Sequence, residues 1–395
     1  MINEKPISKP ACINFSSGPC AKRPGWSVNS LDNALLGRSH RSKEGKIKLK
    51  DAIDKTIDIL GIPEGYKVGI VAGSDTGAIE MAMWNLLGSK PVEILAWEVF
   101  GNDWKKDILE QLKIPNSKPH TADFGHLPDL SKVNFDNDVI FTWNGTTAGV
   151  KVPNADWIPD EREGLVLCDA TSAVFAQEVE WSKLDVVTYS WQKVLGGEAA
   201  HGIIVLSPKA LNHLESFSPA WPIPKIFRLT KENKIIEGVF RGETLNTPSM
   251  LCVEDYLDVL GWVEEIGGLS TCITRANESL SNIENWIEQS DFFDFLCNNI
   301  DYRSNTSVCL KFKKEEIVNK EEEWQRKFAK EIGLFLEKEE VAFDIVNHRS
   351  APPGLRIWTG ATVESSDVEK LLPWIDWAYK QALTNIDSNQ GVDNA

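Results

Sequence analysis

The sequence lacks any run of about 18 apolar residues, so no segment is long enough to cross a bilayer as a helix. Its first ten residues, MINEKPISKP, are polar and contain proline, unlike the charged and then apolar pattern of a secretory signal. It also lacks internal repeats and low-complexity segments. We therefore expect neither export nor a membrane partner, and we place the protein in the cytoplasm.

Cysteine is sparse and scattered. The 395 residues include seven cysteines, none of them in a CxxC pair, and no His/Cys spacing typical of metal ligands occurs. An odd number of dispersed cysteines in a large chain is typical of reduced thiols in a cytosolic compartment. The pattern predicts no metal site.

Basic residues are fewer than acidic residues. Lysine and arginine total 42 against 58 aspartates and glutamates, which gives a formal net charge of −16. Recognition of a nucleic-acid backbone needs a basic face, which this chain could supply only locally. We therefore expect no nucleic-acid partner, and the few places where cations gather become informative.

Between Tyr66 and Pro208, short apolar runs alternate with helical patterns. This alternation predicts an α/β fold with a mainly parallel sheet, helices on both faces and ligands at the carboxyl ends of the strands. The expected strands are VGIVAG (68–73), VEILAW (92–97), VIFTWNGTTAG (139–149), LVLCDATS (165–172), DVVTYS (185–190) and GIIVLSP (202–208).

The chain changes character after Trp262. Two amphipathic stretches predict helices, one around Trp286 and the other from Trp324 to Phe335. The alternating runs TSVCLKF (306–312) and AFDIVNH (342–348), followed by GLRIWTG (354–360), indicate a small antiparallel sheet. We predict a large α/β domain over 15–262, a smaller α+β domain over 263–385 that includes residues 1–14, and a flexible tail over 386–395.

Two polar side chains end neighbouring runs of this pattern. Asp169 follows LVLC, and Lys193 follows DVVTYSWQ about twenty residues later. Each alone would usually be a helix cap or a surface residue. Together they suit pyridoxal phosphate, because a lysine amine can hold its aldehyde as a Schiff base while a carboxylate keeps the ring nitrogen protonated.

Other strand ends carry residues that could complete such a site. The segment GSDTG (73–77) follows a strand and opens a helix, so the N–H groups of Ser74, Asp75 and Thr76 could cradle a phosphate, although a plain capping turn explains it too. Phe100 could stack on a flat ring or belong to the core. Thr146 could bond a ring hydroxyl or serve a turn.

These motifs, taken in order, resemble the class V pyridoxal-phosphate aminotransferases of fold type I, and within them the phosphoserine aminotransferases. The resemblance covers nearly the whole chain. Its motifs are INFSSGP (13–19), SHRSKE (39–44), SDTGA, NGTTAG, CDATS, SWQK, LNTPS (245–249) and NHRSAPPGLRIWTG (347–360).

The resemblance implies a role for each matching residue. Lys193 would be the Schiff-base lysine, Asp169 the partner of the pyridine nitrogen, Thr146 a contact of the ring oxygen and Phe100 the stacking residue. The cofactor phosphate would be held by a set of polar residues, the last two from the other subunit of a homodimer: Asp75, Thr76, Gln192, Asn246 and Thr247.

The family's substrate residues also have counterparts. Ser17 and Arg356 match the clamp on the α-carboxylate, and the distal phosphate would meet His40, Arg41, His348 and Arg349. Guanidinium groups suit carboxylates and phosphates, so these local cations fit anionic substrates entering an acidic protein. Arg38 and Lys43 could equally belong to a solvated basic face.

Two positions depart from the family pattern. Many members have a Gly-rich loop with an arginine at the phosphate cradle and a tryptophan at the stacking position. Here the loop reads Ser-Asp-Thr and the stacking residue is Phe100. A phosphate at this cradle would therefore rely on backbone N–H donors and the hydroxyl of Thr76.

The resemblance implies transfer of an amino group from L-glutamate to 3-phosphohydroxypyruvate, which yields O-phospho-L-serine and 2-oxoglutarate, in serine biosynthesis.

A class V enzyme acting on serine or alanine with glyoxylate is the nearest alternative, but it would need no distal cations. A cysteine desulfurase would need an exposed nucleophilic cysteine, and Cys309 lies inside a strand pattern. A scaffold without activity would not need the set of Lys, Asp and Arg. The sequence leaves open whether the keto acid of vitamin B6 synthesis is also a substrate.

Overall fold

A seven-stranded sheet forms the centre of the computed structural model, which describes residues 4–392. The strands follow the order β1-β9-β8-β7-β4-β2-β3. Their bounds are β1 (Lys67–Ala72), β2 (Val92–Ala96), β3 (Lys118–Thr121), β4 (Asp138–Thr142), β7 (Val166–Asp169), β8 (Val186–Ser190) and β9 (His201–Leu206). Apart from β3, they coincide with the apolar runs of the sequence.

The strand directions in this sheet are mixed at one side. Strands β3, β2, β4, β7 and β8 pair in parallel, whereas β9 pairs antiparallel with both β8 and β1. The five parallel strands carry their carboxyl ends to one edge of the sheet. The predicted mainly parallel α/β sheet is thus confirmed.

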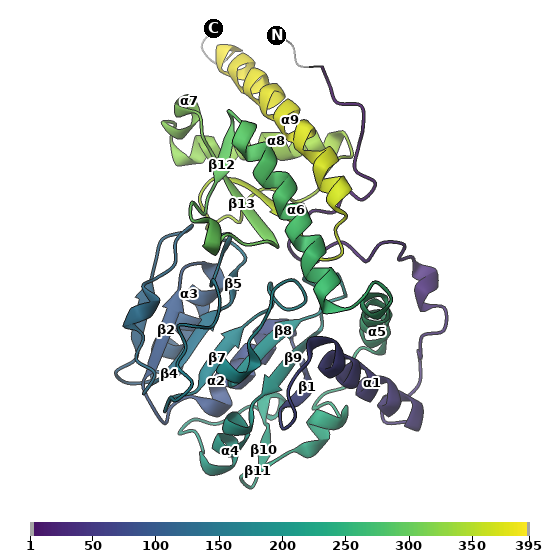
Figure 1. Ribbon diagram of the computed structural model, residues 1–395, viewed down its shortest axis with the longest axis vertical. Coiled ribbons are helices and arrows are strands. Elements are labelled where there is room, and N and C mark those ends of the chain that lie inside the picture. The colour runs from purple at the N-terminus through teal and green to yellow at the C-terminus, as the bar shows by residue number, and fades with distance from the viewer. Residues whose placement is uncertain (1–3, 393–395) are drawn as a thin grey trace.

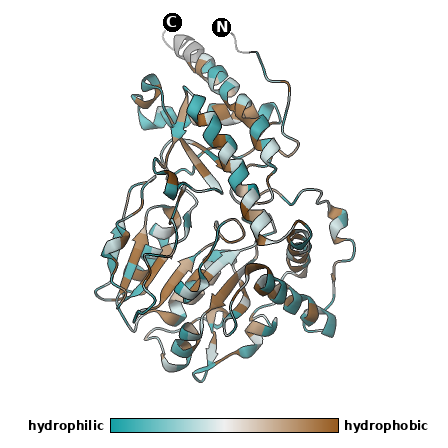
Figure 2. Ribbon diagram, viewed as in Figure 1, coloured by the Kyte–Doolittle hydropathy of each residue, from teal (hydrophilic) through white to brown (hydrophobic). Residues whose placement is uncertain are grey.

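Helices cover this sheet on both sides, and Figure 1 shows α2 and α3 crossing it, α1 lying beside β1, and α5 next to α1. Figure 2 shows the central strands as largely hydrophobic and the outer helices as mixed, as expected for a sheet that is covered on both faces. The bounds are α1 (Lys43–Leu60), α2 (Ser74–Leu86), α3 (Val99–Lys106), α4 (Pro208–Ser216), α5 (Met250–Glu265), α6 (Leu269–Gln289), α7 (Glu315–Val318), α8 (Glu322–Lys338) and α9 (Ser365–Val392).

Short elements complete the chain. Two small hairpins pair β5 (Asn144–Gly145) with β6 (Val150–Lys151) and β10 (Thr230–Lys231) with β11 (Lys234–Ile235). In the segment 4–392, no helix has the combination of length and apolar character that a membrane span requires.

Helix α2 begins immediately after β1, and a glycine makes this sharp junction possible. A Cβ atom on Gly77 would lie 2.0 Å from the backbone oxygen of Ala72, so no larger residue fits without moving the backbone. Gly73 adopts a left-handed conformation (φ 85°) at the N-cap of the helix. The start of α2 is thereby held against the carboxyl-edge end of β1.

A second sheet lies above the first in Figure 1 and packs with α6, α8 and α9. It consists of β12 (Phe293–Phe295), β13 (Ser307–Phe312) and β14 (Gly354–Trp358), all antiparallel. The expected small antiparallel sheet is present, but the run AFDIVNH is not one of its strands. That run makes isolated bridges, one from Phe343 to Asn14 and one from Val346 to Leu355.

The N-terminal residues lie against the C-terminal part of the chain. The backbone N–H groups of Ala11 and Cys12 donate to Asp367, and Trp374 donates to the carbonyl of Ser8. The division at Trp262 stays a prediction, and that residue lies inside α5. Of the expected flexible tail, residues 386–392 belong to α9, while 393–395 and the first three residues of the chain lie outside the described part.

Candidate active site

A cavity opens at the carboxyl edge of the large sheet. It is lined from the start of α2, the start of α3, the turn after β4 and the ends of β7 and β8. The lining residues are Ser74, Asp75, Thr76, Glu98, Phe100, Trp104, Thr142, Asn144, Thr146, Asp169, Thr171, Gln192 and Lys193. Eight residues named from the sequence, from Ser74 to Lys193, therefore meet in this one cavity.

Asp169 and Lys193 come from adjacent strands. Asp169 is the last residue of β7 and pairs in register with Thr188 of β8, and Lys193 follows the end of β8 by three residues. Both side chains line the cavity. The structure therefore brings an amine and a carboxylate to the same space.

The amine of Lys193 lies in a crowded and partly aromatic environment. Its Nζ donates to the carbonyl of Ser17 at 2.5 Å and lies about 6 Å from the ring centres of Phe100 and Trp358. Burial lowers the pKa of Lys193, and the charge of Arg356 lowers it further. A Cβ on Gly18 would lie 2.9 Å from Nζ, so the glycine leaves room for the amine. A lysine with a lowered pKa is a better nucleophile and proton carrier at neutral pH.

Asp169 is buried, with 8% of its surface exposed, and both of its oxygens accept hydrogen bonds. Oδ1 accepts from the backbone N–H of Thr171 at 3.1 Å, and Oδ2 accepts from the indole N–H of Trp104 at 3.2 Å. Trp104 is not among the residues predicted from the sequence. Its place in FGNDW, one helical turn after Phe100, is a signal that could have identified it.

The residues of the α2 start face different ways. Ser74 is half-buried and Thr76 is exposed, but Asp75 is only 6% exposed, although it lines the cavity. Burial raises the pKa of Asp75 well above its usual value, and the neighbouring charge of Asp169 raises it further. Asp75 and Asp169 are therefore neighbours in the cavity lining, and the helix start lies at the same cavity.

Thr146, Gln192 and Phe100 form other parts of the lining. Thr146 is buried and shares a hydrogen bond with the hydroxyl of Ser172 at 2.5 Å. The Oε1 atom of Gln192 is buried and finds no donor within the described chain. Phe100 is half-buried on α3.

Glu98 also lines the cavity, although it is not among the residues predicted from the sequence. The residue is fully buried and caps α3, where its carboxylate accepts from the N–H of Gly101 at 2.7 Å and the hydroxyl of Thr147 at 2.9 Å. It therefore connects the helix that carries Phe100 with the turn that carries Thr146. Burial raises the pKa of Glu98 to about 7.

Replacing Glu98 with Gln should make the free energy of unfolding less dependent on pH. Glutamate ordinarily ionises near pH 4.5, whereas Glu98 keeps its proton to about pH 7 in the fold. Between these values the unfolded chain binds fewer protons than the folded chain, so the free energy of unfolding falls with rising pH, by up to about 3 kcal/mol.

Denaturant unfolding of both proteins at about pH 5 and about pH 8 measures this difference. Glu98→Gln keeps an acceptor for Gly101, so the variant should lose less stability than the parent between the two pH values. An equal loss in the two proteins would contradict the assigned protonation of Glu98.

Arginine and histidine side chains approach the cavity from β14 and the loop before it. Arg356 pairs in register with Cys309 of β13 and acts electrostatically on Lys193. His348 lies near Arg356 and Arg349, and burial together with these two charges lowers the pKa of His348. The structure thus brings part of the predicted cation group towards Lys193.

The other predicted substrate and phosphate residues have different positions. The backbone carbonyl of Ser17 contacts Lys193, but His40 and Arg41 precede α1, where Arg41 is exposed. Asn246 is half-buried and donates to the carbonyl of Thr247. Within residues 4–392 of a single chain, His40, Arg41, Asn246 and Thr247 are not in the cavity lining.

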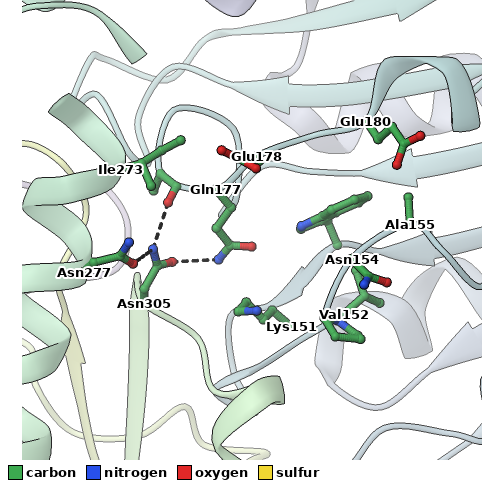
Figure 3. Close-up of a pocket in the computed structure, with 13 residues that line it drawn as sticks. Lys151, Val152, Asn154, Ala155, Gln177, Glu178, Glu180, Ile273, Asn277 and Asn305 are labelled. Atoms are coloured by element: carbon green, nitrogen blue, oxygen red, sulfur yellow. Dashed lines mark hydrogen bonds between the residues drawn. The ribbon is translucent and has the colours of Figure 1, made fainter. Parts of the chain in front are cut away.

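A polar network connects this cavity with a second one, shown in Figure 3. The amide of Gln177 donates to Asn144 at 2.9 Å and to Asn305 at 2.8 Å. Asn305 in turn donates to the carbonyl of Ala176 and to Asn277 of α6, both at 2.8 Å. Four side-chain amides therefore join the lining of the candidate active site to a helix that packs with the small sheet.

The cavity contains groups that fit a flat, phosphorylated aldehyde. Several of its buried polar atoms have no hydrogen-bond partner in the described part of the chain, including Asp75 Oδ1, Thr142 Oγ1, Asn144 Nδ2 and Gln192 Oε1. Such atoms are costly unless another group satisfies them. The amine of Lys193, whose pKa is lowered, the aromatic ring of Phe100 and the N-terminus of α2 line the same cavity.

Solved structures with the same fold include two phosphoserine aminotransferases. The enzyme of Cytophaga hutchinsonii superposes with a TM-score of 0.79, at 21% identity, over 92% of this chain and 98% of its own. One from Trichomonas vaginalis, described as bound to pyridoxal phosphate, gives a TM-score of 0.73 at 18% identity over 92% and 99%. These likenesses show that the chain has the fold of these aminotransferases.

A closer relative narrows the assignment. The phosphoserine aminotransferase of Methanosarcina mazei is 54% identical over 375 residues, which cover 95% of this chain and 99% of that protein. No protein-family model matches the sequence. The chain belongs to the phosphoserine aminotransferase family, and its cofactor is pyridoxal 5′-phosphate.

Proposed function

We propose that the chain transfers the amino group of L-glutamate to 3-phosphohydroxypyruvate, which yields O-phospho-L-serine and 2-oxoglutarate for serine biosynthesis. The observation that carries this proposal is the pairing of Lys193 and Asp169 in one cavity of a chain 54% identical to a phosphoserine aminotransferase. This relative does not favour the alternative of a glyoxylate-dependent transaminase. The two half-reactions should alternate on one site, as ping-pong kinetics require.

Lys193 and Asp169 have the central roles in this proposal. Bound pyridoxal phosphate supplies an electron sink for a carbanion at the substrate α-carbon. Lys193 holds the cofactor aldehyde between turnovers and moves the proton of the α-carbon, a task favoured by its lowered pKa. Asp169 holds the proton of the ring nitrogen, and Phe100 and Thr146 orient the ring.

The phosphate of the cofactor would lie at the start of α2. The N–H groups of Ser74, Asp75 and Thr76 point their partial positive charge there, and Gln192 offers an unpaired side chain. Asn246 of the partner subunit and Thr247 of the partner subunit would complete the cradle. We therefore propose a homodimer with shared active sites.

The substrate would be held by two groups of polar side chains. Ser17 and Arg356 would clamp the α-carboxylate, since Arg356 already acts on Lys193 through its charge. The distal phosphate or side-chain carboxylate would meet His40, Arg41, His348 and Arg349. The positive charges of these residues would attract anionic substrates to a protein whose net charge is −16.

We place the enzyme in the cytoplasm. All seven cysteines are free, and five of them are buried. Reduced and buried thiols are typical of a reducing compartment.

Replacing Arg41 with Ala tests the distal-phosphate role. The variant should lose roughly 10- to 100-fold in kcat/KM for phosphoserine with 2-oxoglutarate, the size expected for charge-assisted hydrogen bonds. With alanine or unphosphorylated serine as the amino donor, the loss should be small. Comparing the two donors separates phosphate recognition from a general loss of activity.

Arg38→Ala is the matched control, because Arg38 is exposed in the same segment and pairs with Glu44. It should leave both rates near those of the parent enzyme. Equal losses for both donors in Arg41→Ala would argue against the assigned role. A parent enzyme that uses serine as well as phosphoserine would argue against the proposed function itself.

A further inference from the structure

Asp75 is placed unlike an ordinary residue of a phosphate-binding turn. It lies in the first turn of α2, where a carboxylate usually faces the helix N-terminus and solvent. Instead, the side chain is buried and faces Asp169 at the end of β7, with the hydroxyls of Thr171 and Thr188 nearby. The Oδ1 atom of Asp75 finds no donor in the described part of the chain.

Two buried carboxyl groups side by side cannot both carry a charge without a large cost. Asp169 accepts the N–H groups of Trp104 and Thr171, which stabilise its ionised form. The hydroxyls of Thr188 and Thr171 favour the ionised form of Asp75, but burial and the neighbouring charge of Asp169 oppose it more strongly. The proton of the pair therefore belongs on Asp75, and burial raises the pKa of Asp75 in the same sense.

We propose that Asp75 is a positioning residue that donates a carboxylic-acid hydrogen bond to Asp169. This inference rests on the proposed function, in which Asp169 pairs with the ring nitrogen of the cofactor. Trp104, Thr171 and Asp75 then hold the Asp169 carboxylate from three sides and fix its direction. The bond forms between the acid O–H of Asp75 and a carboxylate oxygen of Asp169, and no proton needs to leave the pair.

A neutral Asp75 also resolves a conflict at the start of α2. An ionised side chain in this turn would repel a phosphate at the same helix N-terminus. The uncharged acid removes that repulsion, while the backbone N–H groups of Ser74, Asp75 and Thr76 remain available. The Asp in the loop, which departs from the family pattern, is thus compatible with a phosphate cradle.

Infrared difference spectroscopy of the holoenzyme detects the proposed proton directly. A protonated carboxylic acid has a carbonyl band that a carboxylate lacks, and the band shifts in D2O. At a pH about two units above the pKa of Glu98, ordinary carboxyl groups and Glu98 are ionised. Under these conditions the parent enzyme should still show the band, and Asp75→Asn should lose it.

Glu80→Gln is the matched control, since Glu80 lies on the same helix, is half-buried and lies outside the cavity lining. It should keep the band. Absence of the band in the parent enzyme, or its persistence in Asp75→Asn, would overturn the proposal. The measurement on the parent enzyme stands even if a variant fails to fold.

Kinetics of two substitutions separate a donated hydrogen bond from simple packing. Asp75→Asn keeps a neutral donor and should retain kcat/KM within about threefold, whereas Asp75→Ala should lose roughly tenfold, the size of one buried hydrogen bond. Equal losses in the two variants would contradict the proposal. If the enzyme rejects phosphoserine but the infrared band is present, the proposed substrate fails and the Asp75–Asp169 hydrogen bond stands.

Discussion

Lys193→Ala should lower kcat by at least roughly 10³-fold, because it removes the amine that we propose both holds the cofactor aldehyde and moves the α-proton. No other lysine lines the cavity among residues 4–392, so no neighbouring amine can take over. Steady-state assay with phosphoserine and 2-oxoglutarate measures the loss. The phosphate cradle remains intact in the variant, so bound cofactor need not be lost in parallel.

Lys209→Ala is a suitable control. Lys209 is also half-buried, donates to the backbone carbonyls of Arg162 and Gly164, and has a pKa lowered by burial. It lies near Asp185 at the opposite edge of the sheet. The control should keep kcat, and a Lys193→Ala enzyme of undiminished kcat would remove the assignment.

Asp169→Asn should lower kcat by roughly 10²- to 10³-fold, the cost of removing one partner from a buried charge pair. The amide keeps the shape of the side chain, and its oxygen can still accept from Trp104 or Thr171. The neutral amide cannot balance the positive charge of a protonated ring nitrogen, so the cofactor ring should become a weaker electron sink. Substrate binding should change little. The loss should therefore appear in kcat more than in KM.

Asp138→Asn serves as the comparison for this substitution. Asp138 is also buried, accepts from the N–H of Leu165, and lies at the amino end of β4, away from the cavity. Its replacement should lower stability and leave kcat per folded site unchanged. If Asp169→Asn behaved in the same way, Asp169 would be structural and not part of the chemistry.

Local sequence predicts the parts of the site that depend on strand ends. Asp169 and Lys193 each follow a short β-branched run, and parallel strands bring their carboxyl ends to one edge, so their shared cavity follows from pattern alone. The predicted α/β fold is confirmed for the same reason. The individual roles of these residues stay predictions until they are measured.

What the sequence does not predict depends on side-chain direction and on tertiary contacts. Strand β3 has the sequence KPHT, and its charge and proline are not typical of a strand. The segment forms a strand because it pairs with β2. AFDIVNH alternates like a strand, yet residues 348–353 turn away before β14 and leave it only isolated bridges. Tertiary context thus overrides the local preference in both segments.

Helix α3 carries residues of the cavity lining that the sequence pattern does not predict. From the sequence, only Phe100 is assigned to the site. The structure adds Glu98, which caps the helix, and Trp104, which donates to Asp169. Helical spacing could suggest that Trp104 and Phe100 share a face, but whether that face meets the end of β7 depends on how α3 packs.

In the proposed reaction, amino groups pass through this one site in two separate steps. Mixing the purified holoenzyme with phosphoserine alone, followed by rapid quenching, separates the first step from the second. One equivalent of 3-phosphohydroxypyruvate should be released per active site, then no more until 2-oxoglutarate is added, with little release from unphosphorylated serine. Release only when both substrates are present, or equal release from serine, would rule out this two-step transfer.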